Sequence, residues 1–371
     1  MDMIEAETAT LYELLGRHWT IGAPVIDAMF DPAGDGIAFA LADGGLAIAP
    51  LKDPEPPQDR CRVALDEGRM TISPRRKPVP PLMQVTIGDA PLQLGSLGTS
   101  GFVAGEGDRL LEVSASGVTR VAANHGAAID LLAAVPDGGV LAASDGTVIF
   151  YRADGDVGWL QQRAGGRASA MTVSPDGRRF AMGTAGGLLV RAFGARPDPV
   201  ASYVLGSVSA LSWSPDGSWL AASIAETGIA LVRLADSRTV RIANYPADVT
   251  SLSWSADSRI LLTSGAHRIV AWDVSSLDAG SERPTSVVTG HAGFVLVETV
   301  AMHPERPLVA AGYDDGRLVV AKIGQGDELI VKSPGRGAVQ VLRWSRDGQH
   351  LAVGTRDGEA AIVTFPPHIF K

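Results

Sequence analysis

A short repeated pattern dominates this sequence: an alternating strand that runs into a turn of Ser, Pro, Asp and Gly. The strand and turn recur at residues 168–177, 208–217 and 249–258, where the third copy has Ala256 and Ser258 in place of Pro and Gly. In such a turn Pro fixes φ at the first central position, Asp accepts local hydrogen bonds, and Gly accepts the positive φ that follows. A strand of small apolar residues, a second turn and a third strand follow each copy. The pattern therefore predicts a unit of three antiparallel strands joined by hairpins.

The same unit recurs along most of the chain. Its first turn falls at positions 32, 136, 175, 215, 256, 304 and 346. A degenerate copy at residues 90–113 fits into the long first interval, and with it the units lie about 45 residues apart. That spacing is typical of a β-propeller, in which each blade has four strands, so each three-strand unit is expected to gain an outer strand. The count is then eight blades, or seven if residues 90–113 are an elaborated loop.

Two dipeptides connect the repeat with a known family. Gly290-His291 precedes the seventh unit and Trp272-Asp273 closes the sixth. Together with the turns, they make residues 19–365 resemble the WD-repeat family. The resemblance implies an all-β fold in which residues 1–371 form one propeller of four-stranded antiparallel blades, with eight blades favoured. We identify the chain as a divergent member of that family.

The resemblance also implies a structural role for some polar residues. In the family, a His, a Ser or Thr, an Asp and a Trp form a buried hydrogen-bond chain within a blade. The third unit matches in part through His125, Ser144 and Asp145, with residues 149–151 in the region of the Trp. Three tryptophans, Trp213, Trp254 and Trp344, recur at the end of a first strand, where we expect them to pack blade against blade.

Ring closure and one irregular region complete the predicted architecture. The last unit supplies only three strands, so we expect residues 10–19 to add the fourth and remove the open edge. Residues 52–88 are predicted to be an irregular, proline-rich insertion containing a strand at 61–64. Its extended proline segments are either a linker or a docking ligand for an aromatic groove.

Composition narrows the classes of partner. The net charge of −9 and the lack of a Lys/Arg stripe argue against nucleic acid as a partner. The single cysteine, Cys61, cannot form a disulfide within the chain. No apolar stretch is long enough to span a membrane, and the acidic N-terminal segment lacks the pattern of a signal peptide. We therefore expect a cytoplasmic protein that does not bind a membrane.

The sequence contains no recognisable catalytic or cofactor motif. The seven histidines show no His-x-x-x-His spacing, and Cys-x-x-Cys, Gly-x-Ser-x-Gly and phosphate-loop patterns are missing. We expect no catalytic residue, no metal ligand and no cofactor, and predict that the chain is not an enzyme. The alternative is a propeller enzyme or a small-ligand or metal-binding protein with its site in the central channel, because such sites draw residues from several blades.

A propeller that catalyses no reaction is expected to bind a partner protein through its loops, as a scaffold or adaptor. The residues before each first strand and those in the second turns should meet at one rim of the ring. Aromatic residues and Arg commonly anchor interfaces. The candidate partner-binding residues on this rim are Trp19, His125, Arg167, Tyr245, Phe294, Tyr313, Asp314, Arg336 and Arg356.

Overall fold

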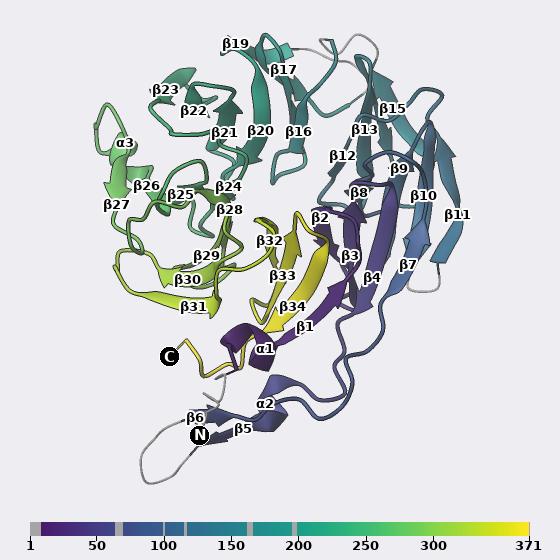
Figure 1. Cartoon of the computed structure of the whole chain (residues 1–371). Coiled ribbons are helices and arrows are strands. Elements are labelled where there is room, and N and C mark those ends of the chain that lie inside the picture. Colours follow the sequence, from purple (N-terminus) through teal and green to yellow (C-terminus); the bar gives the residue numbers. More distant parts are fainter. Residues whose placement is uncertain are drawn as a thin grey trace, which may run out of the picture.

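Eight four-stranded antiparallel sheets follow one another around a ring (Figure 1). The structure is a computed structural model that describes residues 9–63, 70–98, 101–114, 117–161, 166–194 and 199–370. The all-β propeller and the count of eight blades are confirmed, and the degenerate copy at residues 90–113 is a true blade.

The first four blades are continuous in sequence apart from one insertion. Blade 1 contains β2 (Val25–Phe30), β3 (Gly36–Leu41), β4 (Gly45–Pro50) and β7 (Met83–Thr86). Blade 2 contains β8 (Gln93–Gly95), β9 (Phe102–Glu106), β10 (Arg109–Ser114) and β11 (Gly117–Asn124). Blade 3 contains β12 (Leu131–Ala134), β13 (Val140–Ser144), β14 (Thr147–Tyr151) and β15 (Val157–Gln161). Blade 4 contains β16 (Ala170–Val173), β17 (Arg179–Thr184), β18 (Gly187–Ala192) and β19 (Pro199–Val204).

The other four blades complete the ring. Blade 5 contains β20 (Val208–Trp213), β21 (Trp219–Ile224), β22 (Gly228–Arg233) and β23 (Arg238–Ile242). Blade 6 contains β24 (Leu252–Trp254), β25 (Ile260–Thr263), β26 (Val270–Asp273) and β27 (Thr285–Val287), with helix α3 (Ser275–Asp278) before β27. Blade 7 contains β28 (Val297–Met302), β29 (Leu308–Tyr313), β30 (Leu318–Lys322) and β31 (Glu328–Lys332). Blade 8 contains β32 (Val339–Trp344), β33 (His350–Thr355), β34 (Glu359–Thr364) and β1 (Gly16–Thr20).

The core lies between neighbouring blades, so the second strand of a blade is covered on both faces. Every residue of β3, β21 and β29 is buried, which explains why these strands are mainly apolar and do not alternate between polar and apolar residues. Glycines on second strands allow close approach of the next blade. A Cβ added at Gly354 would lie 2.4 Å from a methyl group of Val25, and one at Gly312 would lie 2.5 Å from a methyl group of Val339.

The repeated turns are closed by the same hydrogen bonds in several blades. In blade 5, Ser214 Oγ donates to Asp216 Oδ1 at 2.6 Å, and the backbone N–H of Trp219 donates to Ser214 Oγ at 2.9 Å. The tryptophans before these turns connect blades, since Trp344 Nε1 donates to the carbonyl of Ala301 in blade 7 at 3.2 Å. Trp254 Nε1 likewise donates to the carbonyl of Ser212 in blade 5 at 3.2 Å, and Trp213 packs in the core shared by blades 4 and 5, so the expected blade-to-blade packing of the three tryptophans is observed.

The N-terminal region closes the ring as expected, although with different bounds. Strand β1 pairs antiparallel with β34, with Trp19 opposite Ala360, and Figure 1 shows purple β1 beside yellow β34. Residues 10–15, expected to be part of the strand, instead form helix α1 (Leu11–Leu15) behind a capping box in which Thr10 and Glu13 exchange hydrogen bonds. The helix buries Tyr12 and Leu15 against the core of blades 7 and 8.

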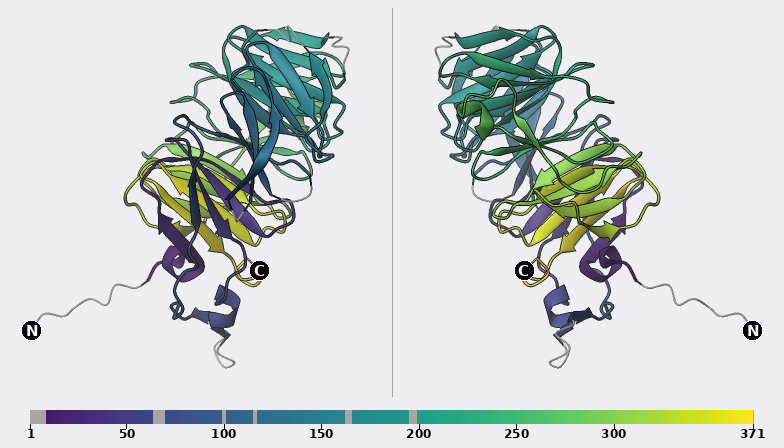
Figure 2. Two further views of the ribbon diagram at one scale, coloured as in Figure 1. Left: turned by 90° about the vertical axis from the view of Figure 1, so that its right-hand side faces the viewer. Right: turned by 90° about the vertical axis from the view of Figure 1, so that its left-hand side faces the viewer.

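The predicted insertion is shorter than residues 52–88, because β7 within it is the outer strand of blade 1. The insertion holds helix α2 (Pro57–Arg60) and a hairpin of β5 (Cys61–Val63) and β6 (Met70–Ile72), which Figure 2 shows projecting from the ring. The expected strand at 61–64 is β5; residue 64 lies outside the described residues. No helix among the described residues is long and apolar enough to cross a membrane.

Candidate interaction face

A buried hydrogen-bond chain lies beneath the rim in blade 3. His125 Nδ1 lies 3.0 Å from the Tyr151 hydroxyl and Nε2 lies 3.0 Å from Ser144 Oγ. Tyr151 thus stands in the region where the family has a tryptophan. Burial lowers the pKa of His125 and raises the pKa of Tyr151 to about 12. His125 is only 8% exposed. The expectation that it lies on the accessible rim is therefore corrected: its role is to hold the blade together through buried hydrogen bonds.

Blade 6 contains the same kind of chain with other residues. The Tyr245 hydroxyl lies 2.9 Å from Thr263 Oγ1 and accepts a hydrogen bond from Trp272 Nε1 at 2.8 Å. Tyr245 therefore occupies the position that His125 has in blade 3, and burial raises its pKa. The sequence reasoning missed this chain because it looked for a histidine. A hydroxyl-bearing aromatic before the first strand, with Thr263 and Trp272 at fixed positions after it, is the signal that could have found it.

Two further predicted rim residues also support the fold. Tyr313 is 1% exposed, and the Arg317 guanidinium lies 4.0 Å from its ring centroid. Trp19 is half-buried on β1 and donates from Nε1 to the carbonyl of Pro80 in the insertion at 2.9 Å. The expectation that Tyr313 lies on the accessible rim is therefore corrected, and Trp19 holds the proline-rich segment against blade 8.

Four of the remaining candidates lie close together in the loops of blades 6, 7 and 8. Backbone hydrogen bonds join these loops: Gly293 N–H donates to the carbonyl of His267, and Asp314 N–H donates to that of Leu296. Gly335 N–H likewise donates to the carbonyl of Asp315. We call the surface that they form the blade 6–8 rim; it consists of Phe294, Asp314, Arg336 and Arg356. Arg167 lies elsewhere, paired with Asp130 of blade 3 at 2.7 Å.

The blade 6–8 rim combines an exposed aromatic residue with a charged network. Phe294 is 100% exposed. Arg356 lies between Asp314, at 3.3 Å, and Glu298, at 3.6 Å. Burial raises the pKa of Glu298, and the charge of Arg356 opposes that rise. Arg336 is exposed and borders a hollow of about 480 Å³ shared with Arg356 and Thr20.

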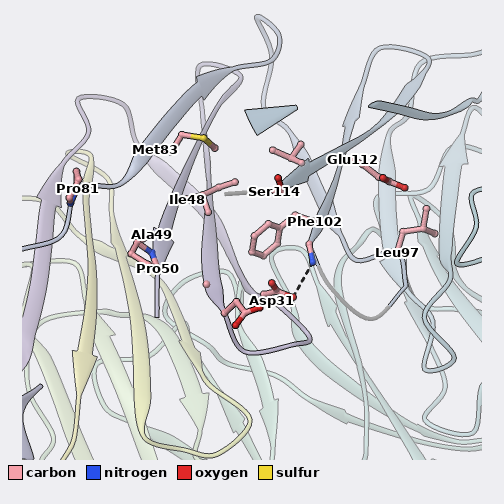
Figure 3. Close-up of a pocket in the computed structure, with 14 residues that line it drawn as sticks. Asp31, Ile48, Ala49, Pro50, Pro81, Met83, Leu97, Phe102, Glu112 and Ser114 are labelled. Atoms are coloured by element: carbon pink, nitrogen blue, oxygen red, sulfur yellow. Dashed lines mark hydrogen bonds between the residues drawn. The ribbon is translucent and has the colours of Figure 1, made fainter. Parts of the chain in front are cut away.

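A larger cavity lies between blades 1 and 2 and was not expected from the sequence (Figure 3). It has a volume of about 680 Å³, and Ile48, Met83 and Phe102 form an apolar part of its wall. At its edge, Asp31 Oδ1 accepts a hydrogen bond from the backbone N–H of Gly101 at 3.0 Å. Its lining comes from β3, β4, β7, β9, β10 and nearby turns, so the cavity lies between blades and not among the innermost strands.

Among the described residues, no group of three or more His, Cys, Asp or Glu could hold a metal ion.

Comparisons with known proteins agree with this geometry. The family model "WD domain, G-beta repeat" matches residues 200–232, 236–273 and 282–320. Each match begins on or just before the outer strand of one blade and ends within the third strand of the next blade. The eight-bladed ring therefore contains repeats of the WD type, and the chain resembles WD-repeat β-propellers both in fold and in these three segments of sequence.

The relatives are distant. The chain is 27% identical to the serine-threonine kinase receptor-associated protein of Gallus gallus over 167 residues, 44% of each chain. It is 28% identical to Protein HIR1 of Eremothecium gossypii over 177 residues, 40% of this chain and 20% of that one. The matches thus span less than half the length of these relatives.

Two solved structures share the fold at 15% identity. One is the computationally designed Ika8 protein, with a TM-score of 0.66 over 93% of this chain and 98% of that one. The other is a chain of the Mitotic Checkpoint Complex, with a TM-score of 0.58 over 74% of this chain and 87% of that one. Sequence identity this low supports similarity of fold alone.

Proposed function

We propose that this chain is a non-catalytic scaffold that holds a partner protein against the blade 6–8 rim. The observation that carries the proposal is Phe294, which is fully exposed on the loop between β27 and β28. Burying a large exposed aromatic side chain against a partner is favourable, because it removes apolar surface from water. Aromatic residues and Arg are typical interface anchors. The printed name of the Gallus gallus relative describes association with a receptor, which supports an interaction role but does not name this chain's partner.

The loops that present Phe294 are held in place before any partner arrives. The backbone hydrogen bonds from Gly293 and Asp314 tie the loop that carries Phe294 to its neighbours on both sides. Arg356 is fixed by two carboxylates, whereas Arg336 is exposed. A pre-ordered surface loses little conformational entropy on binding, so its contacts contribute more fully to affinity.

The test is a double substitution, Phe294→Ala with Arg336→Ala, in a tagged full-length chain. Proteins cross-linked to the chain in its own cells would be recovered and quantified by mass spectrometry. We expect the specific partner to fall by about tenfold or more. The control is Val204→Ala, because Val204 is 88% exposed on β19, in blade 4. Equal recovery with the double variant and the control, with both folded by circular dichroism, would reject this face.

The net charge of −9 supports our further proposal that the partner is neither nucleic acid nor a membrane, and that the protein works in the cytoplasm. Cell fractionation and a mobility-shift assay with duplex DNA and RNA test these points. A shifted nucleic-acid band at physiological salt, or recovery with membranes, contradicts them.

The cavity between blades 1 and 2 favours one second candidate function, the binding of a small ligand. Its volume of about 680 Å³ lies in the range typical of ligand sites. A thermal-shift screen with a metabolite collection, with elemental analysis for a metal in the central channel, tests this alternative. Substituting Ala49→Trp, which adds a large side chain at the cavity wall, should abolish any shift that arises there.

A further inference from the structure

Another hollow lies between blade 6 and residues 243–246, the segment that joins blade 5 to blade 6, beside the loop of Phe294. It has a volume of about 300 Å³, and its walls include Tyr245, Val270, Trp272, Val287 and Val288. It exists because β27 is short: its three residues pair with Ala271, Trp272 and Asp273, and Val270 of β26 has no partner on that side. Val288, just past the end of β27, is 61% exposed. We call this feature the blade 5–6 hollow.

The walls of the blade 5–6 hollow are rigid and mostly apolar. The polar atoms of Tyr245 and Trp272 bond to each other, and the Tyr245 hydroxyl also contacts Thr263. The two aromatic rings are therefore fixed by contacts inside the protein, and their remaining surface toward the hollow is apolar. Fixed aromatic and aliphatic walls around a small opening are the usual environment of an interface hot spot.

A single charge borders the hollow. Arg268 is exposed, and no carboxylate is among the residues that line the hollow. The carbonyl of His267, next to Arg268, accepts the hydrogen bond from Gly293, the neighbour of Phe294. The hollow, Arg268 and Phe294 are therefore linked through adjacent backbone, and one partner could contact all three.

We infer that the blade 5–6 hollow is an anchor site for a peptide segment of a partner protein, in which one large apolar side chain is flanked by Asp or Glu. The inference rests on the proposed function and specifies the chemistry of the partner. The volume of about 300 Å³ suits one large side chain and lies at the lower limit for small-molecule sites. The apolar walls take the side chain, and Arg268 pairs with the flanking carboxylate.

The probe is a library of random twelve-residue peptides displayed on phage, selected against the full-length chain. Enriched peptides are then synthesised, and their affinity is measured by fluorescence anisotropy. We expect them to share a Leu, Phe or Trp beside an acidic residue. Val288→Glu places a carboxylate at the mouth of the hollow and should weaken binding by about tenfold or more. Arg268→Glu should weaken acidic peptides by about fivefold and strengthen matched peptides in which Lys replaces the acidic residues.

The matched control is Val204→Glu, which puts the same charge on another exposed valine. It should leave affinity unchanged. No enriched acidic-apolar motif, or affinity that is the same for Val288→Glu, Arg268→Glu and the control, overturns the inference. Phe294→Ala separates this result from the proposed function. Peptides held in the hollow should keep most of their affinity for that variant, whereas recovery of the whole partner protein should fall. If the partner depends on Phe294 and no peptide depends on Val288, the scaffold role stands and the hollow is not its anchor site.

Discussion

Blades 5 and 8 have nearly the same parts but are assembled differently. Both have a Trp before the first turn, Trp213 or Trp344, and both close that turn with a Ser–Asp hydrogen bond of 2.6 Å. Blade 5 takes its outer strand, β23, from the next stretch of chain, whereas blade 8 takes β1 from residues 16–20. Local sequence therefore forms the three-strand unit in both, but only blade 8 depends on a pairing between distant parts of the chain.

Polar contacts of the N-terminal segment reinforce that distant pairing. Arg17 on β1 is 1% exposed and donates to the carbonyls of Pro50 and Leu51, and its Nε lies 3.7 Å from Asp53. The Tyr12 hydroxyl donates to Glu359 on β34 at 2.8 Å. The contacts of Arg17 attach β1 to the end of β4 in blade 1 and to the insertion, and the contact of Tyr12 attaches α1 to blade 8. The comparison teaches that closure is stabilised by side chains far apart in sequence, so removing them should affect blade 8 most.

The largest effect is expected from removing residues 1–20. The deletion exposes the edge of β34 and the core that α1 covers, so most of the folding free energy, on the order of 5–15 kcal/mol, should be lost. Circular dichroism melting and size-exclusion chromatography measure it. Removing residues 1–8 alone is the control. A chain without residues 1–20 that melts at the wild-type temperature contradicts closure by β1.

Arg17→Met should have the next largest effect. It removes a buried charge and leaves the carbonyls of Pro50 and Leu51 without their donor, which costs about 3–5 kcal/mol in urea unfolding. The counterpart in blade 5 is Arg241 on β23, an exposed residue that donates to the carbonyl of Val204 at 3.1 Å. Arg241→Met should cost less than about 1 kcal/mol. Equal losses of unfolding free energy for the two variants would mean that ring closure by β1 does not depend specially on buried contacts.

Ser214→Ala and Ser345→Ala compare the two turns directly. Each removes the bond to the turn Asp and the acceptor for a backbone N–H, so each should lower the free energy of unfolding by about 1 kcal/mol. Because the geometry is the same, the two losses should agree within about 0.5 kcal/mol. A much larger loss for Ser345→Ala would show that the turn of blade 8 also supports closure.

The smallest effect should be on pH dependence. Burial lowers the pKa of His350, and the charge of Asp347 opposes that shift while Arg17 adds to it. The unfolded chain therefore takes up a proton at a higher pH than the folded one, and stability should fall as pH decreases from about 7.5 to 5. His350→Gln should flatten the plot of melting temperature against pH. His291→Gln, at a side chain 70% exposed, is the control; the same flattening there would contradict this assignment.

Much of the fold could be predicted because the turn chemistry is local. A Ser–Asp hydrogen bond closes the first turn within a few residues in blades 4, 5, 6 and 8, so the repeating units and the missing fourth strand could be located from the sequence. The helix at Leu11–Leu15 was missed because its signal is the short capping box of Thr10 and Glu13. The outer strand β7 was missed because it follows a proline-rich insertion and not a short turn.

The candidate site was predicted less well. Tyr245 and Phe294 both precede a first strand, and both were expected to lie on the rim because only a histidine was expected in the buried hydrogen-bond chain. In the structure Phe294 is fully exposed, whereas Tyr245 is bonded to Thr263 and Trp272. The partners of Tyr245 lie 18 and 27 residues away, so only the folded blade brings them together.

The sequence by itself determined the repeating unit and the class of fold, since both depend on hydrogen bonds between residues near one another in the chain. It favoured eight blades but left seven open, and the structure decided the count because residues 90–113 form part of a blade. Only the tertiary structure decided which rim residues face solvent and where the hollows lie. Those features depend on how the side chains of one blade fill the space beside the next, and that packing is set by contacts between distant residues such as Gly354 and Val25.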